Sequence, residues 1–541
     1  MISLWGIILS APIVLVLGPI LHLIRQYVRQ RFLRKIPGPP SSSWLTGNYV
    51  KLHARNSLSY QDSVSETYGK VFRITGYFGD QKLVISDTTA LHSVIVKNLD
   101  AFDVAEYFLE LRRLLLGRGL LGAPRAGGVH AKHRKLMNPA FSVGHMKRMI
   151  PIFHSVCKQL REVMIADIRS SDCEEIDVLQ YVSRGALELI GQAGFGYTFN
   201  AFTGEKHEFS DALKHVIPAV AKIMKFRPLL PYLTRTFPPW FLRRAGDLLP
   251  MTSVREMIRL SDVMKFYATF IWEEKKRLHA EGEKASNSAL GEGRDILSIL
   301  LRENSKASEE DRLPDNELLA QVNTFLFAGT DTTSNALSRI LCMLAEHPVA
   351  QEQLRKELIE AGAPDANLPY EMLDHLPFLD AVCRETLRLH APVRLMHRIA
   401  RDDRIVPLQE PMVDVDGNVL KEVFVPKGTE IICNIAAVNK DMDIWGPDAS
   451  EWKPERWLGS LPQTHIPGVL ANTLTFSSGG RACIGFKFSL LELKAMLSQL
   501  IPALRFEPST KHALMWRYGS LISPGTSLDS KPELYMHVSC I

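Results

Sequence analysis

A glycine-rich loop carries the residue with the clearest chemical potential, Cys483. Residues 476–485 read Phe-Ser-Ser-Gly-Gly-Arg-Ala-Cys-Ile-Gly, and the apolar run after them predicts a helix from about 485 to 500. A cysteine near a helix N-terminus meets free N–H groups and a favourable dipole, which stabilise its thiolate. A thiolate binds iron and promotes cleavage of an O–O bond. A lone cysteine is more often a buried structural residue, so the whole pattern has to carry the interpretation.

The loop resembles the haem-binding loop of the cytochrome P450 family, which reads Phe-x-x-Gly-x-Arg-x-Cys-x-Gly. Every fixed position of that pattern is matched here. The resemblance implies that Cys483 is the axial ligand of the haem iron and that Arg481 meets a haem propionate. Phe476 and Gly485 complete the expected haem-binding loop.

A second chemical signal interrupts a long apolar helix predicted from Gln321 to Leu344. The interruption reads Ala-Gly-Thr-Asp-Thr-Thr over residues 328–333, and its glycine and threonines cost about 2–3 kcal/mol of helix propensity. Such a local conflict often marks a functional site, although a tolerated kink has the same pattern. The segment resembles the oxygen-binding stretch of the P450 distal helix. The resemblance implies that Thr332 stabilises activated oxygen and that Asp331 feeds protons to it.

Two further motifs together resemble a structural triad of the same family. Glu385-Thr-Leu-Arg388 places both charged side chains on one helix face, and Pro-Glu-Arg456-Trp follows downstream. An isolated Glu-x-x-Arg pair is weak, because surface helices carry many of them. The resemblance implies that Glu385, Arg388 and Arg456 form a buried triad that supports haem capture.

Besides Arg481, three further cationic or imidazole side chains are expected at the haem propionates. His130 and Arg134 share one face of a helix predicted from Ala131 to Met137, where many family members have Trp-x-x-x-Arg. The histidine in place of tryptophan resembles a variant common among fungal members. Arg398, ten residues after Arg388, resembles a further propionate-binding arginine. Taken alone, each of these side chains would be interpreted as a solvated surface charge rather than as a haem contact.

The N-terminus has the pattern of an uncleaved membrane anchor. Residues 1–24 contain no Lys, Arg, Asp or Glu, and a helix of this length exceeds a hydrocarbon core of about 30 Å. Five cations follow between Arg25 and Lys35, which favours a cytosolic body. We therefore expect a transmembrane anchor over 1–24, a basic, proline-rich hinge over 25–40 and a haem domain over 41–541. A buried core helix is the alternative for the first segment.

The remaining pattern predicts a mainly α-helical body with smaller β-sheets, the class of the cytochrome P450 fold. The 541 residues have ordinary globular composition, and a net charge of +5 gives no argument for nucleic-acid binding. Seven cysteines without a Cys-x-x-Cys pair disfavour a zinc ribbon and fit a reducing compartment. The resemblance extends the expectation to the endoplasmic reticulum membrane, in a single-pass orientation.

The resemblance implies an enzyme that inserts one oxygen atom from O₂ into a lipophilic small molecule, such as a fungal terpenoid, using haem b. No flavin or nicotinamide fingerprint is apparent, so NADPH electrons require a separate reductase, with cytochrome b5 as a further candidate donor. Cations expected on the face that meets the reductase are Lys132, Arg134, Lys135, Lys487 and Lys494. The alternatives are a haem-thiolate isomerase or dehydratase without O₂ activation, and a non-catalytic haem-binding protein.

Overall fold

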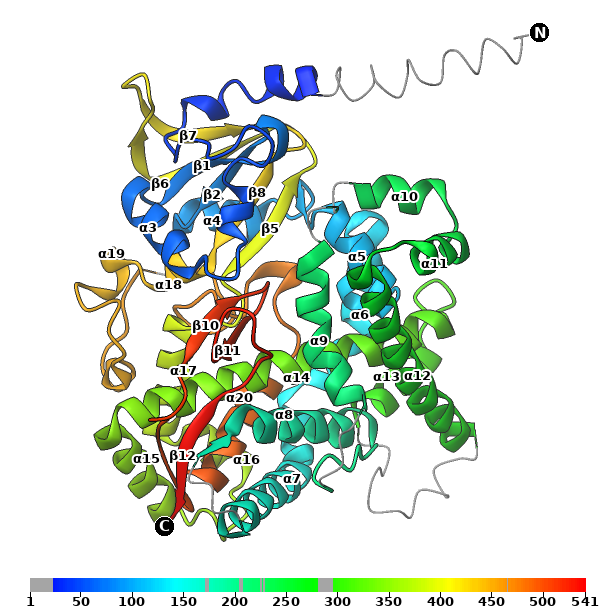
Figure 1. Cartoon of the computed structure of the whole chain (residues 1–541), viewed down its shortest axis with the longest axis vertical. Coiled ribbons are helices and arrows are strands. Elements are labelled where there is room, and N and C mark those ends of the chain that lie inside the picture. The colour runs from blue at the N-terminus through cyan, green and yellow to red at the C-terminus, as the bar shows by residue number, and fades with distance from the viewer. Residues whose placement is uncertain are drawn as a thin grey trace. The chain divides into compact units, whose positions relative to one another are not determined.

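The structure is a computed structural model, and it describes residues 23–170, 175–203, 208–223, 226, 229–280, 295–464 and 466–541. The chain divides into two compact units. The first contains the residues up to Ala105 together with Leu395–Val438, and the second contains Glu106–Arg394 and Asn439–Ile541. The first unit is therefore assembled from two segments that lie far apart in the sequence (Figure 1).

The first unit is built on a five-stranded sheet with the order β1-β2-β8-β5-β3. Most side chains of its central strands are buried, as expected for short runs rich in Val, Ile and Leu. A second, two-stranded sheet pairs β6 with β7. The strands of this unit are β1 (Val71–Thr75), β2 (Gln81–Ile85), β3 (Phe102–Asp103), β5 (Leu395–Ala400), β6 (Arg404–Val413), β7 (Val419–Val425) and β8 (Glu430–Asn434). Its helices are α2 (Tyr49–Leu52), α3 (Leu58–Tyr68) and α4 (Thr88–His92), while α18 (Ile435–Asn439) spans the boundary between the units.

The proline-rich hinge is fixed to the edge of the five-stranded sheet. Leu33 and Ile36 are buried, and the backbone N–H of Arg73 on β1 donates to the carbonyl of Pro37 at 2.9 Å. A Cβ added at Gly38 would overlap the carbonyl oxygen of Arg73, so this close approach requires glycine. The segment after the predicted anchor is therefore held by backbone contacts.

None of the helices in the described part of the chain is long and apolar enough to cross a membrane. Residues 1–22, which make up most of the predicted anchor, lie outside the described residues.

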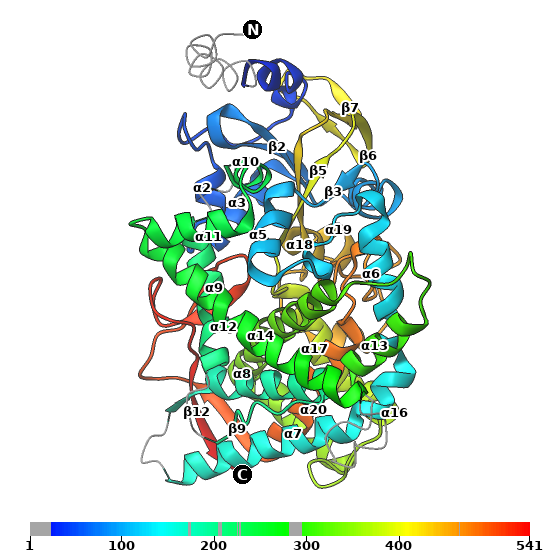
Figure 2. The ribbon, with the colours of Figure 1, turned by 90° about the vertical axis from the view of Figure 1, so that its right-hand side faces the viewer.

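The second unit is mainly helical and surrounds α14 (Asp315–Glu346). Asp315 and Glu317 lie in the first turn of α14, where their charges favour the helix dipole. This helix contacts α8, α12, α17 and α20, and Figure 2 shows it running through the middle of the helical layer. One continuous hydrophobic core fills this unit. The predicted class of a mainly helical protein with small sheets is confirmed.

The helices of the second unit are α5 (Glu106–Leu116), α6 (Val129–Met137), α7 (Val143–Ser170), α8 (Val178–Leu189), α9 (Glu208–Ile223), α10 (Leu230–Thr236), α11 (Pro239–Leu248), α12 (Thr252–Ala280), α13 (Ile296–Lys306), α15 (Pro348–Glu360), α16 (Tyr370–His375), α17 (Pro377–Leu389), α19 (Met442–Trp445) and α20 (Phe486–Leu500). Its strands are β4 (Glu175–Asp177), β9 (Leu504–Pro508), β10 (Met515–Tyr518), β11 (Ile522–Gly525) and β12 (Tyr535–Cys540).

Candidate active site

The cysteine loop is folded by its own backbone hydrogen bonds. The N–H of Cys483 donates to the carbonyl of Phe476 at 2.9 Å, which closes the loop at both ends. Ser477 and Gly479 adopt left-handed backbone conformations with φ of +60° and +64°, and the N–H of Ala482 donates to Gly479. The loop ends at Gly485, and α20 begins at the next residue. Cys483 therefore lies just before a helix N-terminus, where the sequence placed it.

The side chain of Cys483 is exposed. It remains accessible to water-sized molecules, yet it is surrounded by protein atoms on most sides. This burial raises the pKa of the Cys483 thiol, while the backbone N–H of Gly485 and the charge of Arg134 act in the opposite direction and favour the thiolate. A bound cation next to the sulfur would complete the stabilisation that these two groups begin.

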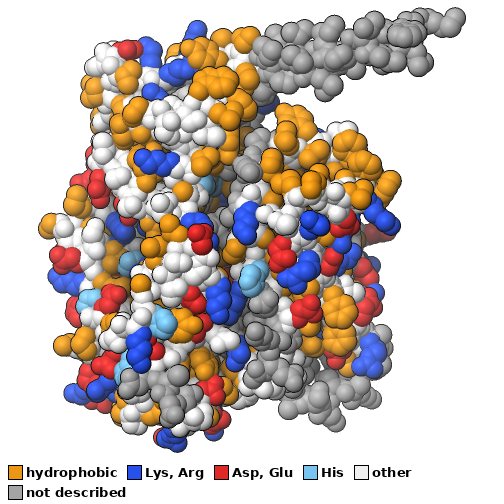
Figure 3. All heavy atoms as spheres, viewed as in Figure 1, with side chains coloured by type: hydrophobic (Ala, Val, Ile, Leu, Met, Phe, Trp, Pro, Cys, Tyr) orange, Lys and Arg blue, Asp and Glu red, His pale blue; other side chains and the backbone are white. Residues whose placement is uncertain are grey.

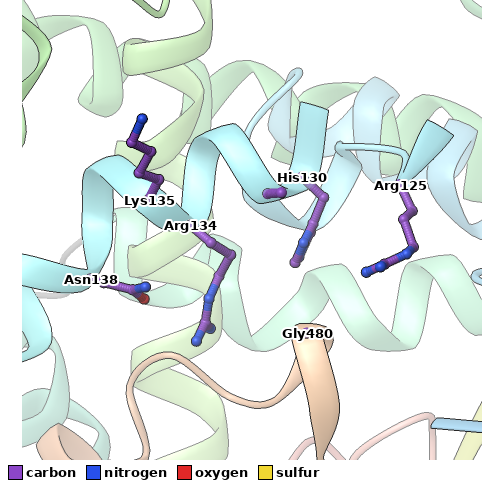
Figure 4. Close-up of a pocket in the computed structure, with 7 residues that line it drawn as sticks. Arg125, His130, Arg134, Lys135, Asn138 and Gly480 are labelled. Atoms are coloured by element: carbon purple, nitrogen blue, oxygen red, sulfur yellow. The ribbon is translucent and has the colours of Figure 1, made fainter. Parts of the chain in front are cut away.

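A cationic pocket adjoins the same loop. The Arg134 guanidinium donates to the carbonyl of Ala482 at 2.8 Å, and Arg481 donates to the carbonyl of Ala123 at 3.0 Å. The pocket has a volume of about 430 Å³. Figure 4 shows Arg134, His130 and Arg125 pointing from the α6 region toward the loop. The residues that line the pocket are Arg125, His130, Ala131, Arg134, Lys135, Asn138 and Gly480.

These residues fit the group that the loop resemblance implies. Haem offers an iron atom that binds thiolate and two anionic propionates. The thiol of Cys483 is accessible, and a pocket with several cationic side chains opens beside its loop. Burial lowers the pKa of the Arg134 guanidinium, and the Cys483 sulfur partly offsets that effect. Anionic groups in this pocket would supply the compensating charge that a buried guanidinium favours. Arg125 was not among the residues expected from the sequence.

The predicted interruption of the long helix does not break α14, which is continuous from Asp315 to Glu346. The burial of side chains along α14 does change at the predicted interruption. Side chains are buried over 321–326 and 333–338, whereas residues 327–329, 331 and 332 are partly accessible in the middle of the helix. The Thr332 hydroxyl donates to the carbonyl of Ala328 at 2.6 Å. Gly329, Asp331 and Thr332 are therefore less completely covered than the flanking residues of the helix, while Thr330 between them is buried.

Asp331 is the carboxyl with a near-neutral pKa on this turn. Burial raises its pKa to about 7, and the charge of Lys214 on α9 opposes this shift. Burial in turn lowers the pKa of Lys214, whose charge is supported by Asp177 and Asp331. A carboxyl with a pKa near 7 can both hold and release a proton at neutral pH. Lys214 was not singled out from the sequence, because nothing in the local pattern of α9 points to α14.

A second buried carboxyl lies behind the same helix. The hydroxyls of Thr333 and Ser489 are 2.8 Å apart and join α14 to α20. Burial raises the pKa of Glu492 well above its usual value, although a hydrogen bond with Thr333 acts in the opposite direction. This buried carboxyl was not predicted from the sequence.

Glu385, Arg388 and Arg456 are brought together in one buried cluster. Arg388 donates to both oxygens of Glu385 at 2.8 Å, and Arg456 donates to one of them at 3.2 Å. The Lys453 N–H and the Trp457 indole also donate to this carboxylate, at 3.0 and 2.9 Å. Burial raises the pKa of Glu385, but the Arg388, Lys453 and Trp457 donors outweigh it, so the net pKa is lowered. Glu385 is therefore a firmly ionised carboxylate.

Asn439 connects this cluster to the start of the cysteine loop. Its amide donates to the carbonyl of Arg388 at 3.1 Å and to the Thr475 hydroxyl at 2.9 Å, and its oxygen accepts the N–H of Leu474 at 2.7 Å. Thr475 donates in turn to the carbonyl of Leu387 at 2.8 Å. The cluster thus positions the segment that leads into the cysteine loop. Asn439 lies outside every motif that the sequence analysis used.

Arg398 belongs to the first unit. It lies on β5, is buried, and donates to the carbonyl of His397 at 2.9 Å and to the Met396 sulfur at 3.0 Å. Burial lowers the pKa of its guanidinium. Its expected contact with a propionate stays a prediction.

The expectation that Lys494 lies on a reductase-facing surface is wrong. The side chain is buried on α20 and forms ion pairs with Asp374 at 3.0 Å and Asp380 at 2.8 Å. Its position on a helix face that packs against α16 and α17 explains the difference. Lys132 donates to the carbonyl of Glu310, and Lys135 forms an ion pair at 2.6 Å with Asp311.

Comparison with known proteins identifies the family. The cytochrome P450 family model matches residues 37–524. The chain is 44% identical to cytochrome P450 monooxygenase 91 of Postia placenta, over 97% of this chain and 98% of that protein. It is 40% identical to ganoderic acid synthetase of Ganoderma lucidum, over 96% of each chain. It is 33% identical to the cytochrome P450 monooxygenase eriI of Hericium erinaceus, over 98% of this chain and 97% of that protein.

These relatives define the class of the protein as an oxidoreductase of the monooxygenase type. The chain belongs to the cytochrome P450 family. Membership in this family implies a bound haem and electrons supplied by a redox partner.

Proposed function

We propose that this protein is a membrane-anchored haem-thiolate monooxygenase that inserts one oxygen atom from O₂ into a lipophilic small molecule. The observation that carries the proposal is the arrangement around Cys483. An accessible thiol lies on a loop bordered by a cationic pocket, and the same unit contains a helix on which Asp331 and Thr332 are partly accessible in mid-length. The family match over residues 37–524 supports the same activity.

In this proposal Cys483 binds the iron of haem b, with Phe476 and Gly485 shaping the loop around it. Arg134, His130 and Arg481, together with Arg398, hold the propionates. The haem, when bound, supplies the chemistry that activates O₂. The cluster of Glu385, Arg388 and Arg456 keeps the loop in place through Asn439 and takes no part in proton transfer.

Asp331 and Thr332 deliver the protons that oxygen activation consumes. Asp331 holds a proton near neutral pH because burial raises its pKa to about 7. Lys214 limits that rise and so keeps the carboxyl able to release the proton. The Thr332 hydroxyl can both donate and accept a hydrogen bond, as a relay requires. Its present bond to the Ala328 carbonyl holds it in a single orientation.

The substrate class we propose is a fungal secondary metabolite such as a terpenoid. The similarity to a ganoderic acid synthetase supports a role in secondary metabolism. NADPH would supply the electrons through NADPH–cytochrome P450 reductase, with cytochrome b5 as a second donor. Lys132 and Lys487 are the cations expected from the sequence that we assign to this partner surface. Lys135 is left out of this assignment because its ammonium group forms an ion pair with Asp311.

We also propose that residues 1–24 anchor the protein in the endoplasmic reticulum membrane, with the body in the cytosol. The uncharged N-terminal run and the cations from Arg25 to Lys35 support this. An apolar surface over α10 and α11 fits contact with a membrane (Figure 3). Its exposed members are Leu229, Tyr232, Leu233, Phe237, Trp240, Phe241, Leu248 and Leu249.

The first test is the absorption spectrum of the dithionite-reduced, purified protein with carbon monoxide. We expect a strongly red-shifted Soret band that is lost in Cys483→Ala and retained in Cys540→Ser, a matched change of a partly accessible cysteine. A band typical of histidine-ligated haem in well-folded wild type would refute thiolate ligation by Cys483 and with it the proposed chemistry.

The second test separates oxygen insertion from the alternatives. Turnover should require NADPH, reductase and O₂, and label from ¹⁸O₂ should enter the product. Conversion of a substrate without NADPH or O₂ would identify an isomerase or dehydratase. Membrane attachment is tested separately, because deletion of residues 1–24 should move the folded protein from the membrane fraction to the supernatant only if that segment is the anchor.

A further inference from the structure

An arginine on α14 lacks the partners that an enclosed guanidinium group normally has. Burial lowers the pKa of Arg339 to about 10, so its side chain keeps a positive charge at neutral pH. Its Nε–H is enclosed and has no hydrogen-bond partner among the described residues. Within the same ranges, Arg339 forms no ion pair with an aspartate or a glutamate. An enclosed charge of this kind is costly unless an anion accompanies it.

The indole of Trp516 on β10 covers one face of this guanidinium and leaves its edge open. The Arg339 Cζ atom lies 3.4 Å from the centroid of the Trp516 ring. At this separation the planar guanidinium lies flat on the ring, because an N–H directed edge-on at the ring would overlap it. The N–H groups of arginine all lie in the plane of the guanidinium. The contact with Trp516 therefore leaves these donors for an acceptor beside the ring.

The titratable groups that act on Arg339 do not supply this acceptor. Glu346 raises the pKa of Arg339, but its carboxylate belongs to an exposed residue two turns further along α14. Cys342 is buried and its pKa is raised to about 12, so its thiol is uncharged at neutral pH. Arg394 is a cation and lowers the pKa of Arg339 further. The acceptor that fits the open edge of the guanidinium therefore comes from a bound molecule.

Arg339 lies on the same stripe of α14 as the turn assigned to oxygen activation. Residues spaced four, three and four positions apart share one face of a helix. The stripe consists of Ala328, Thr332, Asn335 and Arg339. Asn335 is buried, whereas the other three residues are partly accessible. Thr332 and Arg339 are separated by about 10 Å along the helix axis. A molecule held at Arg339 can therefore extend along this stripe to Thr332.

We propose that Arg339 binds the carboxylate of a lipophilic carboxylic acid, which, given the monooxygenase function proposed above, is the substrate. The planar guanidinium donates two parallel hydrogen bonds to a carboxylate and compensates its single charge. The hydrocarbon part of the acid then lies along α14 and brings a carbon remote from the carboxylate to Thr332. A hydroxyl group in place of the carboxylate would leave the charge of Arg339 without a counter-ion. Arg339 therefore selects an acid over the corresponding alcohol.

Equilibrium dialysis of the full-length holoprotein with radiolabelled dodecanoic acid and 1-dodecanol tests this selection without turnover. The wild type should bind the acid at least about tenfold more tightly than the alcohol, because a hydrogen-bonded ion pair forms only with the acid. Arg339→Leu should abolish this preference. Arg339→Lys should retain part of it, since it keeps the charge and loses the planar fork. Arg169→Leu, at an exposed arginine on α7, should leave the preference unchanged.

The dialysis decides the role of Arg339 whether or not oxygen insertion is observed. Equal affinity of the wild type for acid and alcohol would overturn the proposal, and this comparison needs no folded variant. An acid preference that persists in folded Arg339→Leu would place the carboxylate elsewhere and overturn it too. Displacement of dodecanoic acid by an equal concentration of acetate or inorganic phosphate would identify a site for small anions and exclude selection of a lipophilic acid.

The position of oxidation tests the direction in which the acid lies along α14. With reductase, NADPH and O₂, the hydroxyl group should enter dodecanoic acid at carbons near its methyl end, because about 10 Å of helix separates Arg339 from Thr332. Mass spectrometry of the product locates the hydroxyl group. Hydroxylation next to the carboxylate would overturn the proposed placement of the acid.

Discussion

Glu385 and Asp331 both belong to helices of the second unit, yet the pKa values of their carboxyl groups shift in opposite directions. The net pKa of Glu385 is lowered, whereas the pKa of Asp331 is raised to about 7. Burial alone would raise both. The difference lies in the number of donors, since Glu385 accepts from two guanidinium groups, a backbone N–H and an indole.

The comparison shows how one fold assigns different roles to the same functional group. A carboxylate with many fixed donors keeps its charge and organises the structure around it. A carboxyl with one distant cation exchanges its proton near neutral pH. The Glu385 cluster supports the cysteine loop, whereas Asp331 lies on the accessible turn of α14. Substitutions that add or remove donors should therefore change the two sites in different ways.

The largest effect should follow from removing the charge of Glu385 while keeping its shape. Glu385→Gln leaves Arg388 and Arg456 without their shared counter-ion, which should cost about 3–5 kcal/mol of unfolding free energy. Urea unfolding followed by circular dichroism measures this loss, and haem content should fall with it. The control is Glu360→Gln, which breaks the exposed pair with Lys356 and should cost less than about 1 kcal/mol.

The same comparison predicts a pH dependence with a defined sign. Because the folded-state pKa of Glu385 is lowered, its contribution to stability is present above the unfolded pKa and is lost as pH falls through the folded value. The stability gap between wild type and Glu385→Gln should therefore be constant near neutrality and narrow in acid. A gap that widened in acid would contradict the assignment of Glu385 as the ionised member of the cluster.

The second effect should appear in turnover with little change in stability. Asp331→Asn keeps the shape of the side chain but cannot carry a proton. Proton transfer by a positioned group contributes about 10²–10⁴-fold, so product formation should fall at least about tenfold while NADPH consumption continues. The ratio of product formed to NADPH consumed measures this. Asp315→Asn, on the exposed start of α14, should leave the ratio unchanged, and equal ratios for both variants would remove Asp331 from the mechanism.

Motifs contained in one short stretch of sequence were the part of the site that could be predicted. The cysteine loop and the start of the helix after it follow from glycine positions and apolar periodicity. The convergence of Glu385, Arg388 and Arg456 also follows, but only through the family resemblance, because no spacing rule relates residues so far apart. The mainly helical class followed from periodicity, whereas the joining of two distant segments into the first unit did not.

Residues that act through tertiary contacts could not be predicted. Asn439 links two motifs by side-chain hydrogen bonds, yet it belongs to neither. Lys214 reaches Asp331 only because α9 packs on α14. Lys494 was misassigned to the surface, because the helix face that carries it is covered by α16 and α17. In each case the deciding fact is which elements pack together, and local sequence does not contain it.

A smaller effect should follow from removing one of the several donors to Glu385. Trp457→Phe keeps an aromatic ring and removes only the indole N–H that donates at 2.9 Å. A hydrogen bond to a charged group contributes about 1.5–3 kcal/mol, and the remaining donors should limit the loss to the lower end of that range. Urea unfolding measures it, with Trp516→Phe on β10 as the matched change. A loss as large as that of Glu385→Gln would show that the donors do not share the charge.

The smallest effect should be a displacement of the pH profile by Lys214→Met. The Lys214 charge lowers the pKa of Asp331, so its removal should raise that pKa above about 7. If turnover requires protonated Asp331, the alkaline limb of the turnover profile should move to higher pH, while the rate on the plateau stays close to that of the wild type. The Lys214 charge also lowers the pKa of Asp177, so that pKa should rise in the variant as well. Lys222→Met, an exposed lysine on the same helix, should leave the profile in place. An acid limb that moved to higher pH, in place of the alkaline limb, would mean that Asp331 acts in its ionised form.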